Sequence, residues 1–195
     1  GRLSIPYPFV SKPGMDLIIP MNEGISYPAN DASIPEMSLI TYGGHGICMP
    51  FWGVTDGQAG YMAIFETPND AQIRIERLDG LLCVAPAWVP EKQKWGYPRQ
   101  LRYVFFDQGG YVAIAKRYRA YAQEKGLFKT LKEKRDENPN VDRLVGAVNI
   151  WNWDSNAVQM VKTLQEAGIK RILWSNRASA EDVTALNAIE GVLTS

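Results

Sequence analysis

The chain has 195 residues, of which 46% are apolar and 22% are charged, and its formal net charge is zero. This composition is ordinary for a globular protein of one or two domains. It lacks a basic surplus and an apolar run of about eighteen residues, so it predicts no nucleic-acid partner and no membrane partner.

Residues 1–107 have the pattern of antiparallel β-structure. Turn residues such as Asp56-Gly57 and Asp79-Gly80 separate short apolar or alternating runs. Residues Gln72–Arg77 alternate strictly, which is typical of a strand with one buried face. Further strands are predicted at 16–19, 47–52, 60–65, 81–85 and 101–106. Strands at this spacing predict a β-sandwich over residues 1–107.

Cysteine and histidine provide little chemistry in this chain. Cys48 and Cys83 lie in apolar runs without metal-site spacing, which favours buried free thiols over a disulfide. The single histidine, His45, lies in a glycine-rich turn, and neither a GxSxG nor an HExxH motif surrounds it. The residues present therefore predict no metal site, no cofactor and no catalytic histidine.

A helical pattern follows the strands. An apolar face at helical spacing runs from Tyr111 to Ala122. A second, charged helical piece at 128–137 is broken by Pro139. This pattern predicts a helical connector over residues 108–140.

Residues 141–195 repeat a strand–helix unit. Apolar runs at 145–150 and 171–176 are each followed by an amphipathic helix, and a third strand begins at Gly191. Continuous apolar runs suit parallel strands, and helices are the usual crossovers between such strands. The order predicts an α+β multidomain chain, in which a sandwich precedes the first βα units of an incomplete TIM-type (β/α)8 barrel.

Two βα units cannot close a barrel. We therefore expect the apolar faces of Val148, Ile150, Ile172 and Val192 to be covered by the remainder of the polypeptide or by a partner chain.

The ends of the two barrel strands carry the candidate binding residues, because the carboxyl ends of barrel strands carry function. Aromatic rings stack on the apolar faces of sugar rings, while amide and carboxylate groups bind hydroxyls. The candidate substrate-binding residues are Trp151, Asn152, Trp153, Asp154, Trp174 and Asn176. In the alternative interpretation the three tryptophans pack the rim of the barrel and Asp154 caps the next helix.

Aromatic residues are also scattered through the predicted sandwich. They would form either a carbohydrate-binding face or internal packing. These residues are Tyr7, Tyr27, Trp52, Trp88, Trp95 and Tyr97.

Glycoside hydrolysis needs two carboxylates about 5–9 Å apart. Asp154 is the best local candidate, and Glu23, Asp31 and Asp56 lie in predicted sandwich loops. No convincing pair is found, so no catalytic residue is assigned and we expect the catalytic carboxylates beyond Ser195. A non-catalytic carbohydrate-binding or structural β-sandwich module is the alternative.

The order of parts resembles a known family. Tryptophan- and proline-rich loops at 86–90 and 94–99 precede a strand at 101–106 and the helix Gly110–Tyr121, and the first barrel strand follows. This order is similar to glycoside hydrolases with a galactose mutarotase-like sandwich ahead of a (β/α)8 barrel, in particular the α-N-acetylgalactosaminidases and their endo-acting relatives.

The resemblance implies retaining hydrolysis of α-linked galactosamine-type sugars by an Asp nucleophile and an acid/base carboxylate from middle barrel strands. It implies a sugar-contacting role for 151–154 and 174–176, and an extracellular or periplasmic location. The segment alone is expected to be inactive.

Overall fold

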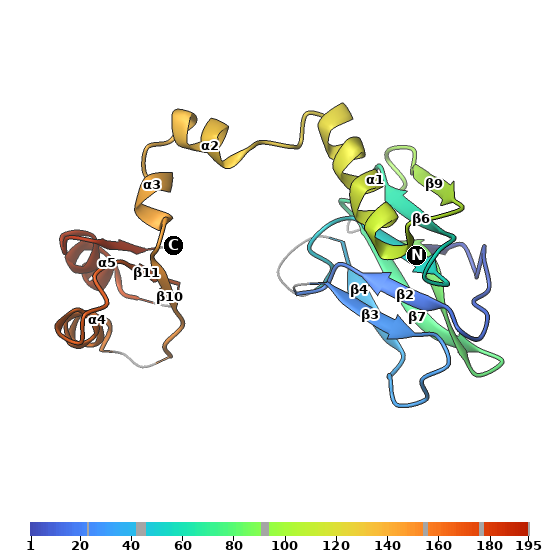
Figure 1. Cartoon of the computed structure of the whole chain (residues 1–195), viewed down its shortest axis with the longest axis horizontal. Helices are drawn as coiled ribbons and strands as arrows, with labels where there is room; N and C mark the ends of the chain where they lie inside the picture. The colour runs from blue at the N-terminus through green and yellow to red at the C-terminus, as the bar shows by residue number, and fades with distance from the viewer. Residues whose placement is uncertain (23, 42–45, 91–93, 154–155, 176–177, 195) are drawn as a thin grey trace. The chain divides into compact units, whose positions relative to one another are not determined.

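The chain forms two compact units, Gly1–Leu127 and Phe128–Ser195 (Figure 1). The computed structural model describes all residues except 23, 42–45, 91–93, 154–155, 176–177 and 195. Within the described part of the chain, no helix is both long and apolar enough to cross a membrane.

The first unit contains two antiparallel sheets. One sheet has the order β3-β2-β5-β6-β9 and the other has the order β1-β8-β7-β4. The strands of the five-stranded sheet are β2 (Asp16–Ile19), β3 (Ile25–Pro28), β5 (Phe51–Thr55), β6 (Gly60–Phe65) and β9 (Leu101–Phe106). Those of the four-stranded sheet are β1 (Leu3–Ser4), β4 (Met37–Ile40), β7 (Ala71–Leu78) and β8 (Leu81–Trp88).

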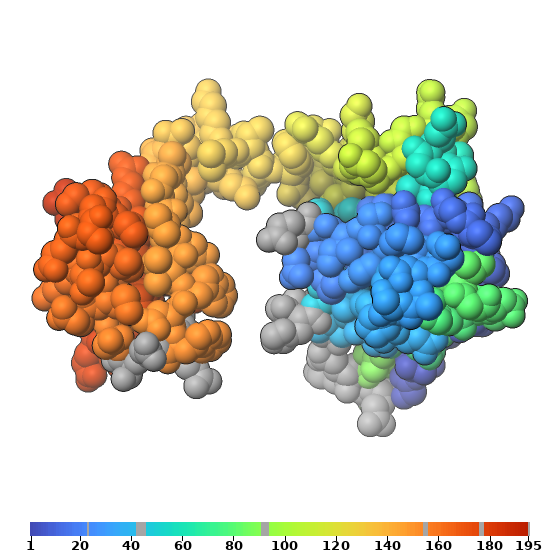
Figure 2. Space-filling model, turned by 60° about the horizontal axis from the view of Figure 1, so that its bottom comes forward, coloured from blue at the N-terminus to red at the C-terminus, as the bar shows by residue number. Residues whose placement is uncertain are grey.

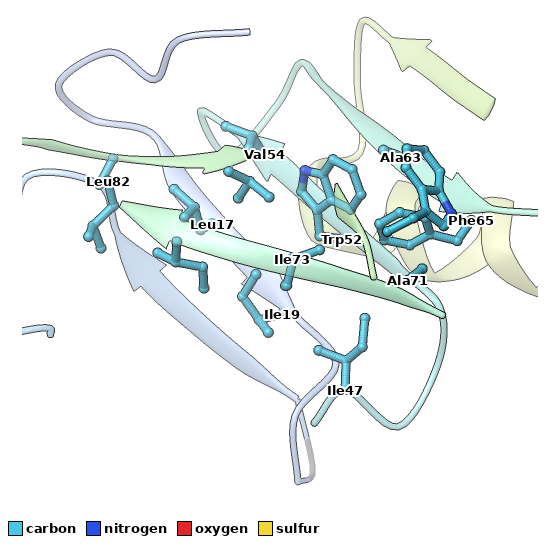
Figure 3. Close-up of a cluster of buried hydrophobic side chains, with 14 residues drawn as sticks. Leu17, Ile19, Ile47, Trp52, Val54, Ala63, Phe65, Ala71, Ile73 and Leu82 are labelled. Carbon is cyan, nitrogen blue, oxygen red and sulfur yellow. The ribbon is translucent and has the colours of Figure 1, made fainter. Parts of the chain in front are cut away.

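The main hydrophobic core lies between these two sheets. Leu17 and Ile19 of β2 and Ile73 of β7 are fully buried in it. Figure 3 shows these side chains together with Trp52 and Phe65 in the same cluster. Alternation along β7 places every second side chain in this core, as the sequence predicts.

Helix α1 (Gly110–Glu124) covers the other face of the five-stranded sheet. Ile114 and Tyr121 of the helix pack with Phe51, Met62 and Ile64 of the sheet. Every residue of β5 is therefore buried, because one face of the strand meets the main core and the other meets α1. In Figure 2, α1 (yellow-green) lies beside the N-terminal strands (blue).

This packing differs from the predicted division of the chain. The expected boundaries were a sandwich at 1–107, a connector at 108–140 and a barrel start at 141–195. In the structure the first compact unit ends at Leu127 and the second begins at Phe128. Helix α1 belongs to the first unit because Ile114 and Tyr121 are buried against the sheet. The helices that follow, α2 (Leu131–Glu137) and α3 (Val141–Leu144), have no buried residues.

The second unit contains a parallel sheet in the order β10-β11-β12. Helices α4 and α5 provide the crossovers between its strands. The elements are β10 (Val148–Ile150), α4 (Ala157–Glu166), β11 (Ile172–Trp174), α5 (Ala180–Asn187) and β12 (Val192–Thr194). Helix α5 begins after the N-cap Ser179, whose side chain accepts a hydrogen bond from the Asp182 amide.

The two faces of the parallel sheet differ. Ile172 and Val192 are fully buried against α4 and α5, so the expectation that only outside chain would cover them was wrong. Ile150 is partly buried in the same cluster, while Val148 remains 43% exposed.

The opposite face of this sheet lies outside that cluster. Leu173 and Leu193 are paired across β11 and β12, and both are only half-buried. Apolar surface without a full cover therefore remains on both faces, at Leu173 and Leu193 on this face and at Val148 on the face of Ile172.

The fold is thus mixed α and β, with antiparallel sheets consistent with a β-sandwich. Both cysteines are free thiols. Cys83 is buried as expected, whereas Cys48 is exposed.

We predict that Gly53→Ala destabilises the first unit by about 1–3 kcal/mol, the usual cost of overpacking a core. A Cβ atom at Gly53 would overlap the Cδ1 atom of Ile114 on α1. Adding Ile114→Ala removes the overlapping atoms, so the double variant should be less destabilised than the two single variants summed.

Urea unfolding, followed by hydrogen exchange of the α1 amides, measures this coupling. A Gly53→Ala protein as stable as the parent, or strictly additive effects, would contradict the packing of α1 on β5.

Candidate functional site

The carboxyl ends of β10 and β11 meet at one edge of the parallel sheet. The Ser175 amide donates a hydrogen bond to the Ile150 carbonyl, with 3.0 Å between nitrogen and oxygen, so the ladder continues to this edge. Trp151 and Trp153 follow β10 and are 65% and 79% exposed. Asn152 is half-buried between them in sequence. Two exposed indoles separated by one amide residue thus mark this edge.

Three predicted residues do not join this exposed pair. Asp154 and Asn176 lie outside the described residues. Trp174 is fully buried in the core of the second unit, with Val161 of α4 and Leu186 of α5. Trp174 pairs with Ile150 and shares its helix-covered face, so the structure assigns it to packing, contrary to the predicted sugar contact.

The loop carboxylates of the first unit stabilise turns. Asp31 accepts hydrogen bonds from the amide and the hydroxyl of Ser33, and these hold the pKa of its carboxyl below the usual range. Asp56 accepts hydrogen bonds from the amides of Gln58 and Ala59. Both carboxylates therefore have local partners that account for their positions.

The remaining loop carboxylate, Glu23, and the single histidine, His45, fall outside the residues that the structure describes. Within the described chain, no group of three or more histidines, cysteines and carboxylates could hold a metal ion.

Most of the scattered sandwich aromatics serve packing. Trp52 and Trp88 lie in the main core, and the Trp88 indole donates a 3.2 Å hydrogen bond to the Thr67 carbonyl. Tyr27 packs against the same core. The Tyr7 hydroxyl donates a hydrogen bond to the Glu76 carboxylate. For these residues the packing interpretation accounts for the position of each ring.

Trp95 and Tyr97 differ from the other sandwich aromatics. Their side chains are 46% and 39% exposed, yet both rings lie against the guanidinium of Arg99. The Arg99 Cζ atom is 3.7 Å from the centre of the Tyr97 ring and 4.7 Å from that of Trp95. Cation–π contacts of this kind fix the orientation of exposed rings.

A buried ion pair holds Arg99 in place. The Arg99 guanidinium binds the Asp70 carboxylate, and their side chains are only 5% and 8% exposed. The Tyr97 hydroxyl donates a 2.6 Å hydrogen bond to the other Asp70 oxygen. The carboxylate of Asp70 therefore connects the cation to one of the two rings.

Burial by itself would raise the pKa of the Asp70 carboxyl. Hydrogen bonds from Arg99 and Tyr97, and the charge of Arg99, outweigh burial and hold this pKa below the usual range. Burial and the hydrogen bond to Asp70 raise the pKa of the Tyr97 hydroxyl. The cluster is therefore held together by an ionised carboxylate at neutral pH.

The pairing of Asp70 with Arg99 was missing from the sequence prediction. The two residues are 29 positions apart and share no local motif. The available signal was the turn Pro68-Asn69-Asp70, together with an arginine two residues after Tyr97. Only the pairing of β7 with β8 and the return of the chain to β9 bring them together.

No protein-family model matches the chain, and no curated protein matches it in sequence. Solved structures of the α-N-acetylgalactosaminidase NagBb from Bifidobacterium bifidum do share its fold. The complex with GalNAc has a TM-score of 0.70 at 22% identity over 93% of this chain and 38% of that chain.

Two further structures of that enzyme agree. The complex with Gal-NHAc-DNJ has a TM-score of 0.73 at 23% identity over 99% of this chain and 40% of that chain. The ligand-free form has a TM-score of 0.70 at 26% identity over 90% and 35%. The chain thus has a glycoside hydrolase-related fold and spans about two fifths of the length of these structures.

We predict that Trp174→Ala destabilises the second unit by about 3–5 kcal/mol, the usual cost of removing a buried aromatic side chain. Trp174→Phe should cost less, because it keeps most of the volume and removes an indole Nε1 that has no hydrogen-bond partner among the described atoms. Trp151→Ala and Trp153→Ala are the exposed controls and should change stability by about 0.5 kcal/mol or less.

Hydrogen exchange of the β11 and α5 amides in urea reports the stability of this unit. If Trp174→Ala and Trp153→Ala destabilised the second unit equally, Trp174 would not be a core residue.

We also predict that Asp70 makes the stability of the first unit depend on pH. Its pKa is lower in the folded state than in the unfolded chain, so its contribution is present at neutral pH. This contribution is lost as the pH falls below about 4, where a carboxyl begins to protonate. Thermal melts from pH 7 to pH 2 should show a steeper loss for the parent than for Asp70→Asn, and parallel curves would contradict the assignment.

Proposed function

We propose that this chain is the N-terminal part of a glycoside hydrolase that acts on α-linked glycans of the N-acetylgalactosamine or galactose type. One observation carries the proposal. The fold matches an α-N-acetylgalactosaminidase with a TM-score of 0.73 over 99% of the chain, through both units. This match of the fold supports the proposed activity.

In this proposal the second unit is the beginning of a (β/α)8 barrel. Its parallel strands with helical crossovers fit such a barrel, because barrel helices cover the outer face of the strands. The half-buried pair Leu173 and Leu193 would then face the barrel interior, where layers of branched side chains pack. The remainder of the polypeptide, or a partner chain, would supply the strands that complete this interior.

The exposed edge of the sheet would contact the sugar. Trp151 and Trp153 offer exposed ring faces for stacking, and Asn152 is proposed as a member of this edge by its position between them in the chain. Asp154 and Asn176 remain proposed members of this edge by their positions in the chain. Orienting the bound ring is the role proposed for these residues, since correct positioning lowers the barrier of the later chemical step.

Bond cleavage would need a pair of carboxylates from barrel strands after residue 195. In a retaining mechanism one carboxylate attacks the anomeric carbon while the other protonates the leaving oxygen, and the second then activates water to release the sugar. The residues described above would bind and orient the sugar without taking part in proton transfer. The 195-residue chain alone is therefore proposed to be inactive.

An assay of the complete polypeptide that contains this chain tests the proposal. We predict hydrolysis of 4-nitrophenyl α-N-acetylgalactosaminide or of the corresponding α-galactoside, with retention of configuration in the sugar first released. The β-linked glycosides serve as controls and should remain intact. Absence of hydrolysis with every α-glycoside tested would refute the proposal.

In the same polypeptide we predict that Trp151→Ala or Trp153→Ala raises KM about fivefold to tenfold, the effect of losing one aromatic stacking contact. The value of kcat should change less, because stacking contributes to binding of both the substrate and the transition state. Leu127→Ala is a matched control, since Leu127 is 66% exposed and lies in the first unit. An unchanged KM in both tryptophan variants would remove this edge from the site.

A further inference from the structure

We propose that Trp95 and Tyr97 form a second carbohydrate-binding surface, on the first unit, that takes a neutral pyranose ring. We refer to Trp95 and Tyr97, with Arg99 and Asp70 behind them, as the aromatic shelf. All four residues belong to the first unit, so this proposal goes beyond the sugar contact proposed for the second unit.

The shelf is exposed although its support is buried. Trp52 and Trp88 of the same unit are 1% and 2% exposed, whereas Trp95 and Tyr97 are 46% and 39% exposed. The Arg99 and Asp70 side chains that hold the two rings are almost inaccessible. The two rings are thus exposed to solvent while the buried side chains of Arg99 and Asp70 fix their positions.

Folding stability alone does not account well for the buried ion pair of Asp70 and Arg99. A buried ion pair loses the hydration of both charges, so its net contribution to folding is small compared with a well-packed apolar pair. The geometric consequence of this pair is clear, because Asp70 binds Arg99 and Tyr97 while Arg99 lies against both rings. Rings fixed before binding lose little conformational entropy when a ligand arrives.

The charge and the rim of the shelf favour a neutral ligand with hydroxyls. Asp70 neutralises the Arg99 guanidinium, so the cluster has no surplus charge for a phosphate group. Lys94 and Gln100 are exposed on either side in sequence, and both carry long polar side chains.

Apolar ring faces beside polar donors match the chemistry of a pyranose. The C–H bonds on one face of the sugar stack on an indole, while its hydroxyls at the rim reach hydrogen-bonding groups. A protein partner is the competing occupant, and a standard interface would cover about 800 Å² on each side. The two rings with a neutralised cation form a small site that fits a single sugar ring better.

Titration of the ¹⁵N-labelled 195-residue chain with methyl α-glycosides of galactose, N-acetylgalactosamine, glucose and mannose tests this proposal. The chain has six tryptophans, and the indole signal that disappears in Trp95→Phe identifies Trp95. We predict that at least one glycoside shifts this signal. Trp95→Ala should weaken the affinity about fivefold or more, and Trp95→Phe should have an intermediate affinity because it keeps a smaller ring.

Tyr111→Ala is the matched control, because Tyr111 is an exposed aromatic residue of the same unit, at 66% exposure. It should leave the affinity unchanged. A Trp95 signal that no glycoside moves, or equal affinity in the parent and in Trp95→Ala, would overturn the proposal and favour a protein-packing role. Failure of hydrolysis in the complete polypeptide would refute the proposed function alone, since this titration involves no bond cleavage.

Discussion

An apolar sheet must be covered on both faces, and this constraint organises both units. In the first unit the five-stranded sheet has the four-stranded sheet on one side and α1 on the other. In the second unit α4 and α5 cover only the face that contains Ile172 and Val192. Leu173 and Leu193 on the opposite face still need a cover, which a closed barrel would supply.

Much of the fold could be predicted from the spacing of apolar residues and from the residues typical of turns. The alternation along β7 and the apolar run of β6 were visible because they are local. The role of α1 was not, because its apolar face is equally compatible with a connector and with a core element. Only the burial of Ile114 against the sheet decides between them.

The candidate site was predicted in part, for a similar reason. A parallel strand in a barrel is apolar on both faces, so composition cannot tell which face a strand-end tryptophan occupies. Trp174 falls in register with Ile150 and packs under the helices, whereas Trp151 and Trp153 follow the last residue of β10 and remain exposed. The ion pair of Asp70 and Arg99 was invisible because it depends on tertiary structure alone.

We propose that the parallel sheet is part of a barrel whose open end holds a sugar. A crystal structure of the complete polypeptide with a bound α-N-acetylgalactosaminide tests it most directly. We predict that Leu173 and Leu193 face a closed ring of parallel strands and that the sugar lies against Trp151 or Trp153. Strands left open at β10, or a sugar bound far from this edge, would contradict it.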